Sequence, residues 1–361
     1  MTMDLIIFLV ALSILVLVHE IGHFVMAIKN GIKVEEFGLG LPPKIFSKKI
    51  GETVFSLNLL PIGGFCRMYG EEASFAEGDK KRILRQAQDR AFCDKKPWQK
   101  MLVVVGGVLM NLVFAVVVFA GVYTVLGLPE ETEKVKIIDV VSGSPADKAN
   151  LKEDFWIYKV AGKAISKPAE LIEEVEKYKG GSVILIIMDE GKERLYNVEV
   201  RKDPPEGEGS MGVAISNTEM KKFPWWQFYK GIGVGFKEAY FWGEIIVGGV
   251  YKMISGLFMG QIPKDVSGPV GMYQATSAIK KEQGFLALIH FFGVVSVNLA
   301  IVNLLPFPAL DGGRMIFVAY EMITKKRVNE KFEVVVNNVG MVILLGLLLL
   351  VTVGDIVRIV R

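Results

Sequence analysis

An apolar stretch near the start of the chain decides the fold: residues 5–28 read LIIFLVALSILVLVHEIGHFVMAI. A helix of about 20 apolar residues can cross the roughly 30 Å hydrocarbon core of a bilayer. Only His19, Glu20 and His23 are ionisable in this stretch. The preceding Met-Thr-Met-Asp lacks the basic start of a secretory signal, and no small-residue cleavage site follows. We therefore expect a retained membrane helix.

Three further stretches are long and apolar enough to span a membrane. They are residues 101–128, 285–305 and 334–354, and none of them contains Asp, Glu, Lys or Arg. The chain is 51% hydrophobic, and 22% of its residues are charged. Many of the apolar residues are concentrated in these runs. The sequence therefore predicts a polytopic α-helical membrane protein with about four transmembrane helices.

The loops between these stretches predict their orientation. Residues 29–100 and 306–333 are dense in Lys and Arg, and such loops stay on the cytoplasmic side. We expect a multi-pass protein of the cell membrane with both of these loops in the cytoplasm and both chain ends outside. Cys66 and Cys93 lie in the first loop and are expected to be free thiols on a reducing side. A net charge of +3 without a basic, aromatic-lined face excludes nucleic acid as a partner.

Residues 129–205 form a small domain in the external part of the chain. Strand-like alternation and helix-like spacing follow one another there, which predicts a compact α+β module. The order of elements and the sequence GSPADKA at 143–149 resemble a PDZ domain as bacterial proteases carry it. Asn150 stands where such domains usually have Gly, and Asn tolerates the same left-handed backbone.

Residues 206–284 are expected to link this domain to the second membrane half. Apolar residues recur at helical spacing in 231–258, but Lys and Glu interrupt them too often for a comfortable span. We expect a helix on the membrane surface, in contact with lipid headgroups. The chain then has four parts: residues 1–128 and 285–361 form the two membrane halves, 129–205 the PDZ-like domain and 206–284 the surface linker.

The sequence His19-Glu20-Ile21-Gly22-His23 has the form H-E-x-x-H. Four helical residues turn about 400°, so both imidazoles lie on one face, one turn apart, and can bind one zinc ion. Glu20 lies beside them and suits a general base. The alternative is a pair of buried histidines that hydrogen-bond between helices, and it leaves Glu20 unexplained.

A third ligand is needed, because a catalytic zinc usually has three protein ligands and one open position. It must lie at the depth of His19, in the cytoplasmic third of the membrane. His290 starts an inward-running helix at the wrong depth, so we expect it to pack or hydrogen-bond between helices. Asp311 follows the third stretch in NLLPFPALDGGR, residues 303–314, where two prolines end the helix and two glycines free the turn to aim the carboxylate. A lone D-G-G is often only a turn, but H-E-x-x-H favours the metal interpretation.

Together the two motifs resemble the signatures of site-2 proteases, the intramembrane zinc metalloproteases, and in particular the bacterial regulator-of-sigma-factor protease branch with one PDZ domain. Further matching stretches cover nearly the whole chain: PIGGFCRMYGE at 61–71, KPWQKM at 96–101, GVLMN at 107–111 and SGPVG at 267–271. One departure is Val108, where the family usually has Pro. The resemblance implies one zinc ion per chain on His19, His23 and Asp311, with Glu20 as the general base.

The resemblance also implies a substrate-binding role for four residues. Asn303 would contact the substrate backbone and help hold the developing oxyanion. Gly63, Gly64 and Phe65 would belong to a membrane-reentrant hairpin that offers an edge strand to an extended substrate. An ordinary cytoplasmic hairpin is the alternative.

These features predict an endopeptidase that hydrolyses peptide bonds within the transmembrane segments of single-span membrane proteins. Anti-sigma factors and remnant signal peptides are the two expected substrate classes, each after a first cut by a site-1 type protease. The PDZ-like domain would filter substrates outside the membrane or hold a peptide ligand.

Two alternatives come from other classes of protein. A catalytically silent, zinc-binding membrane adaptor would need no base, so the intact Glu20 argues against it. A zinc transporter should line several spans with His and acidic residues, and residues 101–128 and 334–354 have none.

Overall fold

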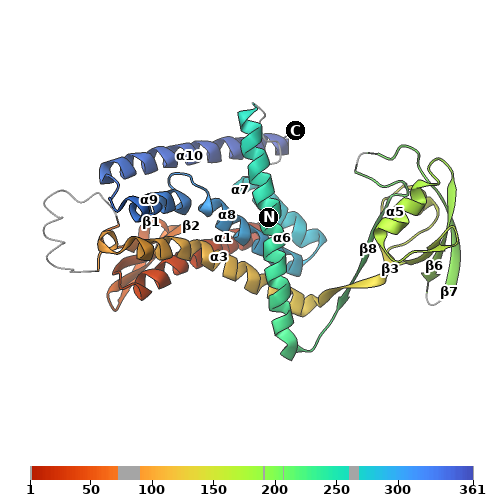
Figure 1. The fold of residues 1–361 in the computed structure, drawn as a ribbon, viewed down its shortest axis with the longest axis horizontal. Helices are drawn as coiled ribbons and strands as arrows, with labels where there is room; N and C mark the ends of the chain where they lie inside the picture. Colours follow the sequence, from red (N-terminus) through yellow and green to blue (C-terminus); the bar gives the residue numbers. More distant parts are fainter. Residues whose placement is uncertain (1, 72–89, 190–191, 206, 260–267, 361) are drawn as a thin grey trace. The chain divides into compact units, whose positions relative to one another are not determined.

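The computed structural model describes residues 2–71, 90–189, 192–205, 207–259 and 268–360 (Figure 1). The chain divides into two compact units. One consists of Met1–Tyr123 with Phe228–Arg361, and the other of Thr124–Gln227. The first unit holds the apolar helices, and the second holds the small α+β domain.

Four helices among the described residues are long and apolar enough to cross a membrane, and they coincide with the four predicted stretches. They are α1 (Thr2–Lys29), α3 (Pro97–Leu126), α8 (Phe285–Leu304) and α10 (Glu330–Val360). Pro97 begins α3, at the helical position where a missing N–H costs nothing. The prediction of a polytopic helical membrane protein is confirmed.

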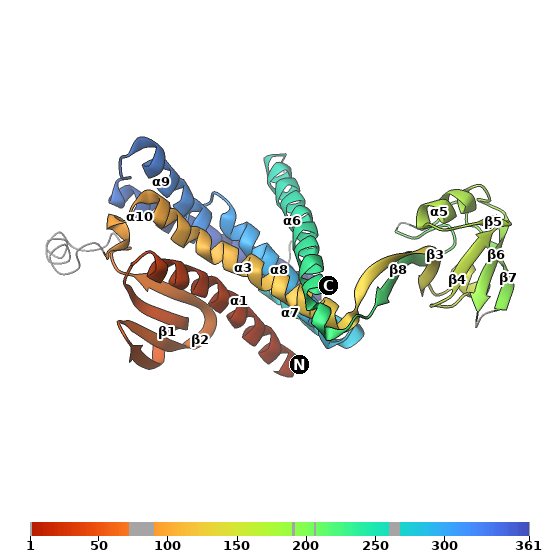
Figure 2. The same cartoon turned by 60° about the horizontal axis from the view of Figure 1, so that its bottom comes forward.

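Small residues bring α1 and α3 into close contact (Figure 2). A β-carbon added to Gly22 of α1 would lie 2.2 Å from the carbonyl oxygen of Gly106 in α3. Membrane helices use such positions because lipid provides no hydrophobic drive between helices, so close packing must hold them together. On α8, the Ser296 hydroxyl donates to the Asn111 carbonyl of α3 over 2.8 Å. Helix α3 is therefore the shared partner of α1 and α8.

Residues 206–284 contain two helices of the first unit, α6 (Phe228–Phe258) and α7 (Pro269–Glu282). Helix α6 packs on α3 and α8 through a buried cluster that includes Phe119, Ala239 and Val297. Glu238 of α6 pairs with Nε2 of His290 on α8 over 3.1 Å, which confirms the predicted interhelical role of His290. The location of α6 at the membrane surface stays a prediction.

Helices α7 and α9 (Asp311–Thr324) are each held by a charged residue of another helix. The Oδ2 atom of Asp355 in α10 accepts the N–H groups of Gly268 over 2.9 Å and Gly271 over 2.8 Å, and so caps the start of α7. The buried Lys100 at the start of α3 donates to Glu321 of α9 over 2.8 Å. These contacts join elements that are distant in the sequence.

Strands β1 (Val34–Ile50) and β2 (Thr53–Met68) form an antiparallel hairpin beside α1 (Figure 2). The first part of β1, residues 34–39, pairs on one side with residues 54–57 and on the other with residues 64–68 of β2. Residues 64–68 pair only with β1 among the described strands, so they form an edge. The hairpin packs on α1 through buried residues that include Ala27, Phe37 and Cys66. Neither Cys66 nor Cys93, which lies in a short 3-10 helix (Phe92–Asp94), forms a disulfide, as predicted.

The described residues of the second unit form an antiparallel sheet with a short helix of four residues and a longer helix of nine residues. The sheet order is β7-β6-β4-β3-β8, and β5 pairs with β4 at its side. The elements in chain order are β3 (Leu128–Val140), α4 (Pro145–Lys148), β4 (Trp156–Val160), β5 (Lys163–Ala164), α5 (Pro168–Glu176), β6 (Ser182–Asp189), β7 (Lys192–Glu199) and β8 (Val213–Lys221), followed by a 3-10 helix (Trp225–Gln227). Asn150 has a φ of 60°, the left-handed backbone predicted for it.

The sheet continues beyond the predicted end of the domain at residue 205. Strand β8 pairs with β3 along most of its length, from Val213 with Val140 to Lys221 with Leu128. The Pro- and Gly-rich residues 203–205 and 207–209 therefore lie inside the domain, before its last strand, rather than in a linker after it. Composition alone cannot separate these two cases, because both need the same turn-forming residues.

Candidate active site

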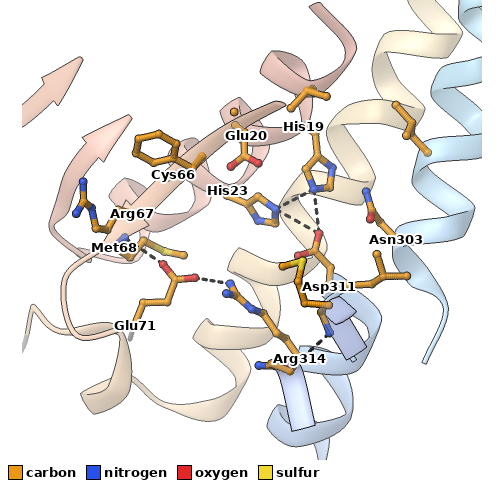
Figure 3. A pocket seen from close by; sticks show the side chains of 18 of the residues that line it. His19, Glu20, His23, Cys66, Arg67, Met68, Glu71, Asn303, Asp311 and Arg314 are labelled. Carbon is orange, nitrogen blue, oxygen red and sulfur yellow. Dashed lines mark hydrogen bonds and ion pairs between the residues drawn. The ribbon is translucent and has the colours of Figure 1, made fainter. Parts of the chain in front are cut away.

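A cavity of about 670 Å³ opens between α1, β2, α3, α8, α9 and α10 of the first unit. Figure 3 shows the side chains that line it. The predicted site residues that line it are His19, Glu20, His23, Gly64, Phe65, Asn303 and Asp311. Gly63 lies at the adjacent bend of β2 with a φ of 87°. The fold therefore brings together residues from both ends of the sequence.

Three of these side chains converge on one point. His19 Nε2 lies 3.1 Å from His23 Nε2, and the Oδ2 atom of Asp311 lies 3.1 Å from the former and 3.3 Å from the latter (Figure 3). A tetrahedral ion with metal–nitrogen bonds of about 2.0–2.1 Å sets its ligand atoms about 3.3 Å apart. The triangle thus has the size of one face of such a coordination sphere.

The Oδ2 atom of Asp311 supports this interpretation. It is buried and accepts no hydrogen bond within the described part of the chain, although two ring nitrogens stand next to it. A buried carboxylate oxygen without a donor is costly, and a cation would compensate it. The two imidazoles and the carboxylate are a donor set that zinc prefers.

The histidine rings are oriented by contacts with α3. The Nδ1 atom of His23 lies 2.9 Å from the carbonyl oxygen of Val103, to which it donates when Nε2 carries no proton. The Nδ1 atom of His19 lies 3.4 Å from the amide of Asn111. Contacts of this kind fix the ring and leave the other nitrogen for a metal.

Asp311 is positioned by the end of α8 and the start of α9. Helix α8 ends at Leu304, and Leu305 is extended, as the two following prolines predict. The predicted reason for Gly312 and Gly313 was wrong, because neither has a positive φ. A β-carbon on Gly312 would instead lie 2.0 Å from the carbonyl oxygen of Leu305. These glycines let α9 begin directly beneath the preceding loop, and Asp311 occupies its first turn.

Glu20 lies between the metal-sized triangle and the edge of the hairpin (Figure 3). A β-carbon on Gly64 would stand 3.3 Å from Cγ of Glu20, so the glutamate stem lies directly against the edge strand. Glu20 does not belong to the triangle of ligand atoms. Glu20 therefore lines the cavity next to the ligand atoms and against the edge strand.

Several residues that line the cavity have no site role predicted from the sequence. Arg314 of α9 pairs with Glu71, whose Oε2 also accepts the N–H of Met68 at the end of β2 over 3.1 Å. Asn337 of α10 accepts the N–H of Ala309 over 3.3 Å. An amide inside an apolar helix was the available signal for Asn111 and Asn337, since lipid-facing helices rarely carry one without a purpose. No local sequence pattern predicts the pairing of Arg314 with Glu71, because the two residues are 243 positions apart.

Comparisons with known proteins give the family of this chain. The sequence profile of peptidase family M50 matches residues 7–347. A Clostridium perfringens protein with a provisional zinc metalloprotease name is 36% identical over 351 residues, with 97% of each chain covered. The zinc metalloprotease RasP of Geobacillus kaustophilus is 29% identical over 417 residues, covering 97% of this chain and 96% of its own. A Staphylococcus aureus protein with a provisional name of the same kind is 29% identical over 425 residues, with 97% of each chain covered.

Among solved structures, the PDZ domain of an SdrC-like protein from Listeria innocua matches 24% of this chain and 99% of its own. The sequence identity is 17% and the TM-score is 0.21. The description of the second unit as PDZ-like therefore rests on its own strand order and on the GSPADKA sequence.

Proposed function

Because this chain belongs to peptidase family M50, the site-2 protease family, we propose that it uses its zinc metalloprotease activity on peptide bonds inside the membrane. The observation that carries the proposal is the convergence of His19, His23 and Asp311 beside Glu20, in a cavity formed by apolar helices. Ionisable groups at such a depth are costly unless they perform a function.

The zinc ligands in this proposal are His19, His23 and Asp311, with one zinc ion per chain. Two observations support this assignment: the spacing of the ligand atoms, and the lack of a hydrogen-bond donor to Asp311 Oδ2 among the described residues. Zinc in such a site supplies Lewis-acid polarisation of a carbonyl group and makes water more acidic. All three residues line the cavity, through which a substrate would reach them.

Glu20 is proposed as the general base. Its carboxylate accepts a proton from the attacking water while the oxygen of that water bonds to the substrate carbonyl carbon. It then returns the proton to the leaving nitrogen as the C–N bond breaks. Its place against Gly64 supports this role, because a substrate paired with the edge strand would run past Glu20.

Substrate binding is proposed to use residues 64–68 as an edge. A transmembrane helix hides its peptide bonds, so the segment must unwind before hydrolysis, and its exposed N–H and C=O groups then need partners. Pairing with Gly64 and Phe65 would supply them as in other strand additions. Asn303, which lines the same cavity, would donate its amide hydrogen to the substrate carbonyl as charge develops on that oxygen.

The hairpin is proposed to re-enter the membrane from the cytoplasmic side. Its exposed side chains include Leu41, Ile45, Phe46, Leu59 and Leu60, which suit lipid better than water. Residues 29–100 and 306–333 would face the cytoplasm and both termini the outside, as the positive-inside rule favours.

The PDZ-like domain is proposed to select substrates that have already been cut outside. A hollow of about 270 Å³ lies between α5 and β8, lined by apolar residues that include Leu171, Val175 and Ile215. Strand β8 is an edge of the sheet, so a peptide could pair with it and place an apolar side chain in the hollow. A trimmed substrate fits such a filter, and anti-sigma factors or remnant signal peptides are the proposed classes.

The proposal is tested by reconstituting the purified protein in liposomes with single-span substrates. Each substrate, an anti-sigma transmembrane segment or a signal peptide, is made with a full and with a trimmed external part. We expect cleavage within the apolar segment, mapped by mass spectrometry, and faster cleavage of the trimmed form. Cuts confined to the water-exposed parts would contradict intramembrane hydrolysis, and equal rates for both forms would contradict the filter.

A further inference from the structure

We infer that Asn111 is a positioning residue of the metal site: its side-chain carbonyl accepts the Nδ1 proton of His19 and keeps Nε2 of that ring free for the metal. This inference rests on the proposed zinc ligands. It concerns a residue of α3 that touches neither the triangle of ligand atoms nor, in the proposed mechanism, the substrate.

The first observation is the burial of Asn111. It is 0% exposed, and its Oδ1 atom has no hydrogen-bond partner within the described residues. From residue 101 to residue 122 of α3, Asn111 is the single polar side chain in an apolar run. A buried amide of this kind is unfavourable unless its polar atoms are paired.

The second observation is the contact with His19. The Nδ2 atom of Asn111 lies 3.4 Å from His19 Nδ1. A neutral histidine that binds a metal through Nε2 carries its proton on Nδ1, so this contact would then bring two donors together. The oxygen and nitrogen of a side-chain amide have nearly the same shape, and the hydrogen-bond network decides between its two orientations. Rotation by half a turn gives Oδ1 the ring N–H as its donor.

The two histidines therefore differ in what fixes them. His23 donates to the main-chain carbonyl of Val103, which no side-chain substitution removes. His19 depends on the side chain of Asn111 alone, and the main-chain carbonyl of Asn111 separately accepts the Ser296 hydroxyl over 2.8 Å. Such outer contacts of metal-binding histidines commonly change metal affinity by about 10-fold to 100-fold. His19 is thus the ligand whose outer hydrogen bond a single side-chain substitution in α3 can remove.

The test compares three substitutions of Asn111 in the full-length protein in detergent. Asn111→Leu keeps the branched shape of the side chain but removes the acceptor, and Asn111→Ala removes the acceptor without adding bulk. Asn111→Asp keeps an oxygen acceptor for the ring N–H. Ser296→Ala is the matched control, since it removes a contact of the Asn111 main chain and leaves the side chain intact. Zinc affinity is measured by competition with a chromophoric chelator, and the ligand field is measured by the absorption spectrum of the cobalt-substituted protein.

We expect zinc affinity about 10-fold to 100-fold weaker in Asn111→Leu and Asn111→Ala, with an altered cobalt spectrum. Asn111→Asp should keep affinity within a few-fold of the parent protein, as should Ser296→Ala. Parent affinity and spectrum in Asn111→Leu or in Asn111→Ala would overturn the inference, whichever of the two can be purified folded. A parent protein that binds no zinc, or that keeps its zinc after Asp311→Asn, would instead contradict the proposed ligands.

Discussion

Gly107 of α3 lies so close to His23 of α1 that a β-carbon added to it would stand 2.4 Å from Nε2, the ring nitrogen that faces Asp311. The same β-carbon would stand 2.7 Å from Cε1 of His19. Helix α3 thus has no side chain at the position where both rings need space. One turn earlier, its Val103 carbonyl accepts the Nδ1 proton of His23. The metal-sized triangle depends on how closely the two helices approach.

Gly107→Ala should therefore damage the metal site directly. The added methyl group must displace a ring or separate the helices, because atoms do not approach to 2.4 Å without a bond. We expect zinc affinity to fall on the order of 10-fold to 100-fold and cleavage to fall with it. Gly121→Ala is the control in the same helix, since nothing lies within 4 Å of its added carbon. Equal zinc affinity in both variants would show that the helices can adjust at no cost.

Gly64→Val should impair cleavage but leave zinc binding unchanged. The new side chain would meet Glu20 Cγ and the carbonyl oxygen of Gly38, at 3.3 and 3.2 Å for its first carbon alone. A displaced base and a blocked edge should lower kcat/KM on the order of 10-fold or more. Ser47→Val, on an exposed part of the opposite edge of the hairpin, is the control. Loss of zinc from Gly64→Val would mean that the hairpin supports the metal site rather than the substrate.

The sequence was sufficient for the parts of the site that are local. H-E-x-x-H needs only helical spacing, and the run before Asp311 contains its own helix-ending prolines. Four apolar stretches of the right length predicted the four described helices that are long and apolar enough to cross a membrane, since bilayer thickness constrains length so strongly.

The parts that the sequence could not predict depend on contacts between distant segments. The fit of Gly107 beneath the histidine rings and the pairing of Arg314 with Glu71 follow from how helices and hairpin dock. The packing of α6 on α3 and α8 and the pairing of Glu238 with His290 were not predicted either, because the partners of a helix do not follow from its own sequence. Periodicity describes one helix face and not the partner that covers it.

Asp355→Ala should destabilise the membrane unit. The buried carboxylate accepts two N–H groups at the start of α7, so its removal leaves both without a partner. Loss of a helix cap costs about 1–2 kcal/mol, which should lower the thermal midpoint in detergent by several degrees. Gly354→Ala is the adjacent control, with nothing within 4 Å of the added carbon. An unchanged midpoint for Asp355→Ala would show that α7 does not need this cap.

The two thiols should react slowly with maleimides in the folded protein. Burial raises the pKa of the Cys66 thiol, and burial likewise raises the pKa of Cys93. Because only the thiolate reacts, labelling at neutral pH should be slow and should accelerate as the pH rises. In single-cysteine variants Cys66, which is 8% exposed, should label more slowly than Cys93. Labelling of Cys66 at the rate of the unfolded chain would contradict its burial against α1.

His19, His23 and Asp311 are proposed to bind the catalytic zinc, and Glu20 is proposed to move the proton. The most direct measurement is zinc content, by elemental analysis, together with cleavage of a single-span substrate for the parent protein, Glu20→Gln and Asp311→Asn. We predict one zinc ion per chain and cleavage in the parent, the same zinc without cleavage in Glu20→Gln, and weakened zinc with little cleavage in Asp311→Asn. Cleavage that persists in Glu20→Gln, or full zinc affinity in Asp311→Asn, would contradict these roles.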